Sequence, residues 1–190
     1  MNVEDVHKHN INTETRDMWI HGVMTEGEYE PGIDWRSATT AVKNILLLNA
    51  LGQEPFTIHL HTCGGDVEQG MAIYDTIRAV RNDVTIIGYS EVRSMSSIIF
   101  LAGDKKYLMP SAKYMIHKGY FGMEDYATLV YTNVEESKRF DEWMLDLYAE
   151  YSDFTVRELE DMMDKKGDVF FTAEEAYFHG FSDGIWGEFK

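Results

Sequence analysis

Three side chains of the kinds used in nucleophilic catalysis follow one another along the chain as Ser94, His117 and Asp168. Ser94 stands before an apolar run, so it can open a helix whose first N–H groups stabilise negative charge at a serine nucleophile. His117 ends a short apolar segment, and an imidazole suits a general base near neutral pH. Asp168 precedes another apolar segment and can hold the imidazole in one tautomer. Taken singly, each residue also fits a structural role, as an N-cap serine, a structural histidine or a loop aspartate.

A pair of glycines, Gly64 and Gly65, lies between a predicted strand and a predicted helix. Glycines let the backbone turn sharply there and leave N–H groups pointing outward, where they can bind an oxyanion. The structural alternative is a tight turn, and two glycines alone favour it. The later glycines and the lysine of a phosphate-binding loop or a dinucleotide fingerprint are absent, which excludes those two motifs.

Other residues offer competing chemistry. The Cys63 thiol can be paired with His117 as a nucleophile, but a lone cysteine is more often a small buried residue. His59, His61 and Cys63 alternate along one predicted strand and share a face, so a zinc site is conceivable. No fourth ligand is obvious, and packing at the strand edge is the stronger interpretation. Ser96 is an alternative nucleophile one step further into the helix.

The elements that must position these residues follow from the apolar periodicity. Strands are expected over 17–24, 56–61, 84–88, 106–109 and 114–117. Helices are expected over 37–51, 67–81, 94–103, 125–151, 155–165 and 172–179. A loop is expected over 25–34, and Thr172 with Glu175 forms a capping box. Strands that alternate with helices at this spacing indicate an α/β fold with a largely parallel sheet, built as one domain over 16–190 behind a flexible polar arm over 1–15.

Composition limits the classes of partner. A chain of 190 residues makes about one domain of ordinary size, and a hydrophobic fraction of 44% excludes a disordered chain. The net charge of −16 argues against general nucleic-acid binding and against docking on an anionic membrane. One cysteine fits a reducing compartment. With no apolar secretory segment in the first residues and no stretch of membrane-spanning length, we expect a cytoplasmic protein.

Taken together, several stretches resemble a known family. They are Thr62-Cys63-Gly64-Gly65, Gly70-Met71-Ala72-Ile73-Tyr74-Asp75-Thr76, Ser94-Met95 and Met115-Ile116-His117. The ClpP family, the proteolytic subunits of the Clp protease, carries Ser-Pro-Gly-Gly, Gly-Met-Ala-Ile-Tyr-Asp-Thr, Ala-Ser-Met-Gly and Met-Ile-His in that order. The segment from Gly167-Asp168 to Asp183 resembles the ending of the family's sequences, so the resemblance extends from about Asp17 to the C-terminus.

The resemblance implies a ClpP/crotonase-type βαβ superhelix with a protruding handle helix over about 125–151. It makes Ser94 the nucleophile, His117 the base and Asp168 the orienting carboxylate. The backbone N–H groups of Gly65 and Met95 form the oxyanion hole, and no metal or cofactor is required. The implied reaction is hydrolysis of peptide bonds in peptides or unfolded proteins.

The resemblance also implies heptameric rings that stack as a tetradecamer through the handle helix, and an AAA+ unfoldase as partner. The aromatic face of that helix, with Tyr126, Phe140, Trp143 and Tyr148, is larger than an isolated helix leaves in water. The alternative is packing within the same subunit.

Departures from the family pattern surround the site. Cys63 replaces proline, Arg93 replaces a small residue, Ser96 replaces glycine, and Lys118-Gly119 replaces Gln-Pro. Arg93 and Ser96 are therefore expected to crowd the turn of the nucleophile. A catalytically weak ring subunit with a structural or regulatory role is one alternative. A crotonase-type acyl-CoA enzyme is another, although it needs no Ser-His pair.

Overall fold

The computed structural model describes residues 3–21, 32–119, 122 and 124–187. Within them a mixed sheet runs in the order β1-β2-β3-β4-β5-β8, with β6 joined to β4, and β7 to β6. The strands are β1 (Ile11–Asn12), β2 (Asp17–His21), β3 (Phe56–Thr62), β4 (Val84–Arg93), β5 (Lys105–Leu108), β6 (Lys113–Ile116), β7 (Val169–Thr172) and β8 (Gly184–Ile185). Only β1 and β7 pair antiparallel with their neighbours, so the prediction of an α/β fold with a largely parallel sheet is confirmed for these residues.

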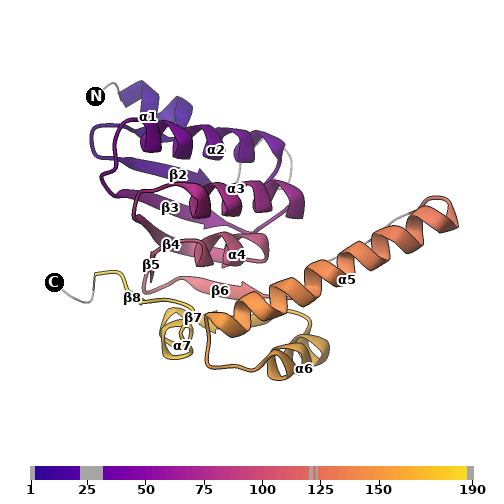
Figure 1. The fold of residues 1–190 in the computed structure, drawn as a ribbon. Helices are drawn as coiled ribbons and strands as arrows, with labels where there is room; N and C mark the ends of the chain where they lie inside the picture. Colours follow the sequence, from indigo (N-terminus) through magenta and orange to yellow (C-terminus); the bar gives the residue numbers. More distant parts are fainter. Residues whose placement is uncertain (1–2, 22–31, 120–121, 123, 188–190) are drawn as a thin grey trace, which may run out of the picture.

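Helices pack on the sheet in sequence order. Three of them, α2, α3 and α4, lie side by side over one face, and the longest, α5, projects from the body (Figure 1). The helices are α1 (Val3–His9), α2 (Trp35–Ala50), α3 (Val67–Ala79), α4 (Met95–Leu101), α5 (Ala127–Glu150), α6 (Val156–Lys166) and α7 (Ala173–Phe178). None of the helices in the described ranges is long and apolar enough to cross a bilayer.

Local sequence explains α2 and β3. Asp34 caps α2 by accepting hydrogen bonds from the backbone N–H groups of Arg36 and Ser37, and the Ser37 hydroxyl accepts in return from the Asp34 N–H. The buried positions of α2 recur every three or four residues, which places one stripe on the sheet. In β3 buried and half-buried residues alternate strictly, as expected of a strand with one covered face.

The N-terminal region differs from the sequence prediction. We predict a flexible arm over 1–15, whereas the structure has α1 followed by β1, which pairs with β2. Ile11 is buried, and the Asn44 side chain donates to the carbonyls of His9 and Asn10. A single apolar anchor and one buried amide thus order a segment whose composition is polar. The predicted strand 17–24 is found to His21, and the rest of it, with most of the loop 25–34, lies outside the described residues.

The long helix has two different ends. Towards its C-terminus Tyr148 is fully buried and Phe140 and Trp143 pack against the core, so this part of its aromatic face covers the same subunit. Towards its N-terminus Tyr126 and Tyr131 are 82% and 70% exposed. The outer half of α5 therefore presents aromatic side chains to solvent.

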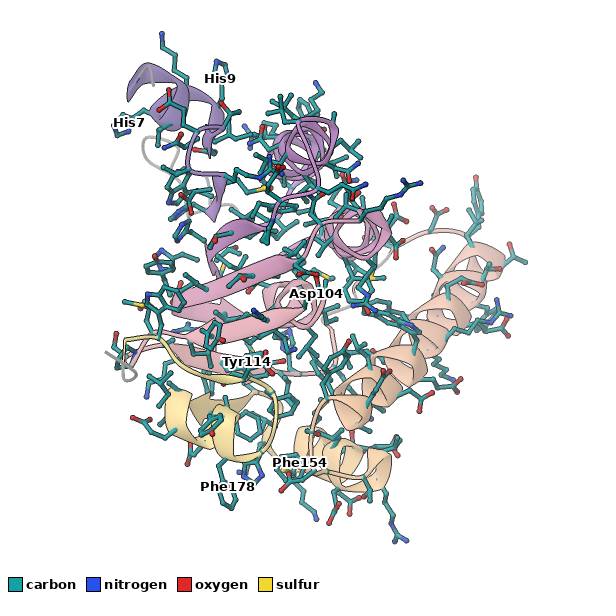
Figure 2. All side chains as sticks on the ribbon, turned by 60° about the vertical axis from the view of Figure 1, so that its left-hand side comes forward. His7, His9, Asp104, Tyr114, Phe154 and Phe178 are labelled. Carbon is teal, nitrogen blue, oxygen red and sulfur yellow. The ribbon has the colours of Figure 1, made fainter. Side chains whose placement is uncertain are left out.

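An aromatic cluster supports the strands below α4. Tyr114 of β6 is fully buried and packs against Phe100, Phe171 and Phe181. Phe154, just before α6, stacks on the ring of His179. Figure 2 shows Tyr114 inside the molecule and Phe154 at the border of this region. The cluster fixes β6 and β7 against α7, and these two strands lead into the candidate site.

Candidate active site

The length of β4 brings two candidate residues together. Its residues 85–88 pair with β5, and its residues 91–93 pair with β6 in parallel. Beyond the last pair, the Ser94 N–H donates to the Met115 carbonyl at 2.9 Å. Because His117 directly follows β6, parallel pairing places Ser94 and His117 at the same edge of the sheet.

The antiparallel pair β6–β7 supplies the third residue. Ile116 lies opposite Val169, so His117 and Asp168, the next residues outward on each strand, face one another. Gly167 precedes Asp168 with φ +71°, a left-handed conformation that favours glycine at the end of α6. Non-local strand register therefore aligns residues that are far apart in sequence.

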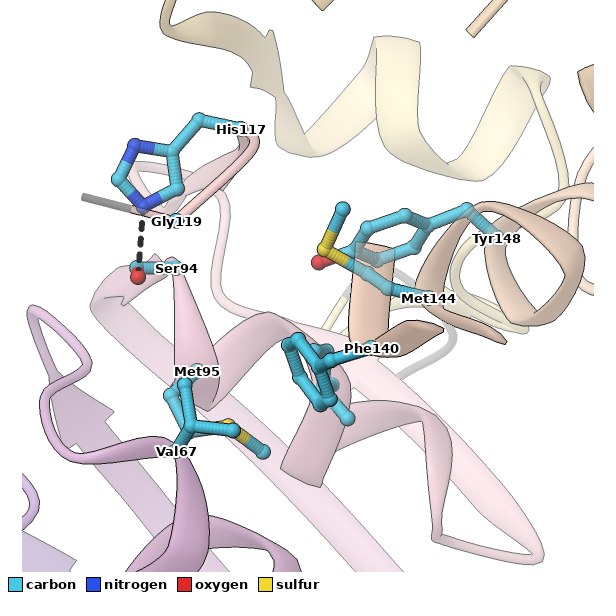
Figure 3. Close-up of a pocket in the computed structure, with 9 residues that line it drawn as sticks. Val67, Ser94, Met95, His117, Gly119, Phe140, Met144 and Tyr148 are labelled. Carbon is cyan, nitrogen blue, oxygen red and sulfur yellow. Dashed lines mark hydrogen bonds between the residues drawn. The ribbon is translucent and has the colours of Figure 1, made fainter. Parts of the chain in front are cut away.

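The three side chains form a continuous chain of hydrogen bonds. His117 Nε2 lies 2.7 Å from Ser94 Oγ, which Figure 3 marks, and His117 Nδ1 lies 3.0 Å from Asp168 Oδ1. An ionised carboxylate only accepts, so Nδ1–H donates to Asp168 and Nε2 accepts from the serine hydroxyl. The His117 side chain is 23% exposed and that of Asp168 is 53% exposed. This arrangement suits nucleophilic attack by Ser94 with His117 as base.

Ser94 sits on a strained turn between β4 and α4. Its φ is 53° and its ψ is −128°, an unusual conformation for a residue other than glycine. Gly64, with φ +99°, packs directly beneath it, and a Cβ added at Gly64 would lie 2.6 Å from Ser94 Cβ and 2.9 Å from the Met95 nitrogen. Only glycine fits this contact, so Gly64 also leaves room for the turn of Ser94, a role beyond the sharp turn that the glycine pair predicts.

The two predicted oxyanion donors lie on different segments: Gly65 in the loop between β3 and α3, and Met95 at the start of α4. Ile33 forms a β-bridge with Gly65. In this bridge the Ile33 N–H donates to the Gly64 carbonyl, and the Asp66 N–H donates to the Ile33 carbonyl. In an extended segment successive N–H groups point to opposite sides, so the Gly65 N–H points away from this bridge. Met95 begins α4, where the first N–H groups lack partners within the helix. Their joint action on an oxyanion stays a prediction.

The Ser96 side chain stabilises the turn between β4 and α4. It is fully buried, its Oγ lies 2.7 Å from the carbonyl oxygens of Thr62 and Arg93, and it accepts from the Arg93 N–H. A hydroxyl in that position cannot approach a substrate. The alternative that makes Ser96 the nucleophile is therefore wrong.

The residues that suggested a thiol or zinc site are arranged differently. Cys63 is exposed, so the expectation of a buried cysteine is wrong. His59 lies within hydrogen-bond distance of Asp17 and of the Tyr89 hydroxyl, and its ring stacks on Trp19. No cluster of three or more potential metal ligands is found in the part of the chain that the structure describes.

A small apolar pocket opens beside Ser94. Figure 3 shows Phe140, Met144 and Tyr148 of α5 facing Val67 and Met95 across it. The three α5 residues recur every fourth position and so share one helix face. Sequence reasoning placed Phe140 and Tyr148 on an aromatic face but did not connect them to the site, because the contact between α5 and α4 is tertiary.

The chain is similar to several known proteins. A model of the family described as Clp protease matches residues 26–188. The ATP-dependent Clp protease proteolytic subunit 2 of Tropheryma whipplei is 33% identical over 156 residues, covering 80% of this chain and 86% of that protein. The subunit 2 of Cutibacterium acnes is 31% identical, over 79% of this chain and 71% of its own length. The corresponding subunit of Deinococcus radiodurans is 28% identical, with coverages of 80% and 76%.

The chain belongs to the Clp protease family. It is a divergent ClpP-type member, as the resemblance predicts. Within this Clp protease subunit, the residues that depart from the family pattern make contacts of their own. Arg93 pairs with Glu91 at 2.9 Å and lies over the ring of Phe170. Lys118 reaches Asp164 at 2.7 Å and Glu160 at 3.4 Å on α6.

Proposed function

We propose that the chain is the peptidase subunit of a Clp-type serine protease, with Ser94, His117 and Asp168 as its catalytic triad. The observation that carries the proposal is the unbroken hydrogen-bond chain from Ser94 Oγ through His117 to Asp168. Family membership supports the reaction class, and this geometry supports the choice of residues.

In the proposed mechanism, Ser94 Oγ attacks the carbonyl carbon of a peptide bond while His117 Nε2 takes its proton. The carbonyl oxygen becomes an oxyanion that the N–H groups of Gly65 and Met95 stabilise. Each such donor is worth about 10²–10³-fold in rate in other serine peptidases. His117 then gives its proton to the leaving amine. Water, deprotonated by His117, hydrolyses the acyl-enzyme and restores Ser94.

The lining of the pocket beside Ser94 indicates which substrate side chains it favours. Its walls are side chains of Val67, Ile98, Phe140 and Met144, with little polar surface. Burial of an apolar side chain in such a pocket is favourable. We expect peptides with an apolar residue on the acyl side of the cleaved bond to react fastest.

The outer half of α5 supports an assembly. Aromatic and aliphatic side chains exposed on a projecting helix, as at Leu129 and Tyr131, fit a surface that another subunit covers. We propose that α5 is the handle through which two heptameric rings stack as a tetradecamer in the cytoplasm. Hydrolysis itself then needs no ATP, and an AAA+ unfoldase delivers unfolded chains. A particle mass of fourteen subunits in solution supports this assembly, and a monomer contradicts it.

Replacement of the nucleophile tests the function. Ser94→Ala should abolish hydrolysis of a fluorogenic peptide and leave the particle mass unchanged, because the hydroxyl supports only the reaction. Ser90→Ala is the control, since Ser90 is an exposed hydroxyl of the same strand. Wild-type cleavage by Ser94→Ala would contradict the triad. An intact wild-type particle with no hydrolysis would favour a structural ring subunit.

A further inference from the structure

Two basic residues adjoin two members of the candidate triad in sequence, and both contact the segment that carries the third member, Asp168. Arg93 precedes Ser94, and Lys118 follows His117. We call residues 156–172, which comprise α6, Gly167, Asp168 and β7, the Asp168 segment. Lys118 contacts this segment before Asp168, and Arg93 contacts it after Asp168.

Packing alone leaves Asp168 weakly fixed. Its side chain is about half exposed, and a Cβ added at the neighbouring Gly167 would meet no atom of the described residues within 4 Å. On the other side Phe170 is 50% exposed, and only Val169 between them is buried. The carboxylate must nevertheless stay within hydrogen-bond distance of His117.

Lys118 supplies a tie on the α6 side. Its Nζ bridges Asp164 and Glu160, which are one helical turn apart and so lie on one face of α6. The hydrogen bond that Lys118 Nζ donates to the Asp164 carboxylate is the main cause that raises the pKa of Lys118 above its usual value, so this ammonium group stays charged throughout the neutral range. Because Lys118 is covalently next to His117, the bridge fixes the distance between His117 and α6.

Arg93 supplies a tie on the β7 side. Its guanidinium carbon lies 5.5 Å from the centre of the Phe170 ring, within the range of a cation–π contact. Glu91 accepts from the same guanidinium and holds it in place. Arg93 thereby links β4, the strand that leads to Ser94, to β7, the strand that begins after Asp168.

We infer that Lys118 and Arg93 are positioning residues that clamp the Asp168 segment against the two strands carrying Ser94 and His117. The inference rests on the proposed function, because it assigns a role relative to that triad. The same positions carry glutamine and a small residue in the family pattern, so the clamp belongs to this chain.

Lys118→Gln tests the larger half of the clamp. This substitution removes the positive charge of the side chain but keeps a polar group at its end. Lys118 does not line the apolar pocket, so the change leaves the pocket intact. We expect kcat to fall about tenfold with KM unchanged, because a small displacement of a catalytic group is costly while substrate binding is untouched. Lys118→Arg should restore most of kcat, and Asp164→Asn should reproduce the loss. Phe170→Leu should lower kcat less, about threefold.

A double-mutant cycle separates positioning from general destabilisation. In an Asp168→Asn background, Lys118→Gln should cause no further loss of kcat, because the group that Lys118 positions is already disabled. A full tenfold additional loss would overturn the inference. So would an unchanged kcat of Lys118→Gln in the wild-type background.

The pH profile provides a readout that a merely structural role would not move. The charged groups around His117 are Asp168 and Lys118, with Asp164 and Glu160 on α6 and Glu91 and Arg93 on β4. Asp141 on α5 also interacts electrostatically with Lys118. Burial raises the pKa of Asp141, and the positive charge of Lys118 partly offsets this rise. If Lys118 positions Asp168, Lys118→Gln shifts the acid limb of the pH profile of kcat/KM to lower pH. The His117 imidazolium then loses its carboxylate partner, which lowers its pKa. If Lys118 acts only as a nearby cation, the limb shifts to higher pH, which would overturn the inference.

The rate at which a fluorophosphonate labels Ser94 distinguishes failure of the clamp from failure of the function. Slower labelling of Lys118→Gln than of wild type supports the clamp. Equal rates contradict the clamp and leave the triad standing. A wild-type particle that is not labelled contradicts the proposed function itself.

Discussion

The two halves of the candidate site are held in different ways. The nucleophile half comprises residues 62–65 and 93–97, and the acid–base half comprises residues 117–118 and 160–170. In the nucleophile half, Met95 is 2% exposed and Ser96 and Ser97 are fully buried. In the acid–base half, the pairing of β6 with β7 aligns His117 and Asp168, and the side-chain contacts are ion pairs between partly exposed groups.

This contrast has a physical consequence. Buried backbone turns keep one geometry because any displacement breaks packing and leaves polar groups unpaired. Exposed ion pairs are individually weak and are screened by salt. We therefore expect added side-chain volume in the nucleophile half to lower activity strongly. In the acid–base half, changes of charge or of ionic strength should lower activity gradually.

The largest expected effect comes from adding one methyl group to the nucleophile half. Gly64→Ala should lower kcat/KM by about 10²–10³-fold, comparable to the loss of an oxyanion donor. The new Cβ would press on Ser94 Cβ, the Arg93 carbonyl and the Met95 nitrogen, and φ +99° disfavours alanine as well. Peptide hydrolysis by the assembled particle measures it.

Gly167→Ala is the matched control in the acid–base half. Gly167 also has a positive φ, but a Cβ added there would meet none of the atoms that the structure describes within 4 Å. We expect a loss of stability of about 1 kcal/mol from the backbone and a change in activity of only a few-fold. Equal losses from the two alanines would refute the contrast between the halves.

A smaller effect is expected from removing the hydroxyl that locks the nucleophile turn. Ser96→Ala leaves the Thr62 carbonyl and the Arg93 N–H without their partner. The cost should be about 1–3 kcal/mol of stability, with about tenfold lower activity, because the unpaired groups are buried. Thermal unfolding and peptide hydrolysis measure the two effects, and full activity in Ser96→Ala would show that the turn does not depend on this lock.

Much of this contrast follows from the sequence, and part of it does not. The order Ser94, His117, Asp168 and the Gly-Gly turn are local motifs, so they can be recognised from residue types. The antiparallel pairing of β7 with β6 depends on contacts more than fifty residues apart, and short strands such as β8 carry little periodicity. The contacts of Lys118 with α6 cannot be predicted from the sequence for the same reason, although Lys118 departs from the family pattern.

Ionic strength should affect the acid–base half selectively. Raising NaCl from about 0.05 M to about 0.5 M should lower wild-type kcat two- to threefold, because the Lys118 pair is exposed enough to be screened. An uncharged peptide removes the contribution of the net charge of −16. Lys118→Gln should lose this salt dependence, and an identical salt response in both proteins would exclude the pair as its source.

The smallest expected effect concerns the start of α6 at low pH. Hydrogen bonds from the Thr155 hydroxyl and backbone N–H lower the pKa of Glu158 below its ordinary value of 4.5. A lowered pKa stabilises the folded state above the ordinary value, and this contribution is lost as the pH falls through the lowered one. Amide exchange in the first turn of α6, corrected for intrinsic rates, should therefore rise below about pH 4.5. Glu158→Gln should remove this pH dependence, and its persistence would assign the opening to another group.

The central claim is that Ser94 is a nucleophile activated by His117, and one measurement tests it directly. The assembled protein is treated with a fluorophosphonate probe, and the mass of the intact subunit and of its peptides is determined. The account predicts a single adduct on Ser94, absent in Ser94→Ala and formed more slowly in Asp168→Asn. An adduct on another residue such as Ser96, or no adduct on an intact particle, would contradict it.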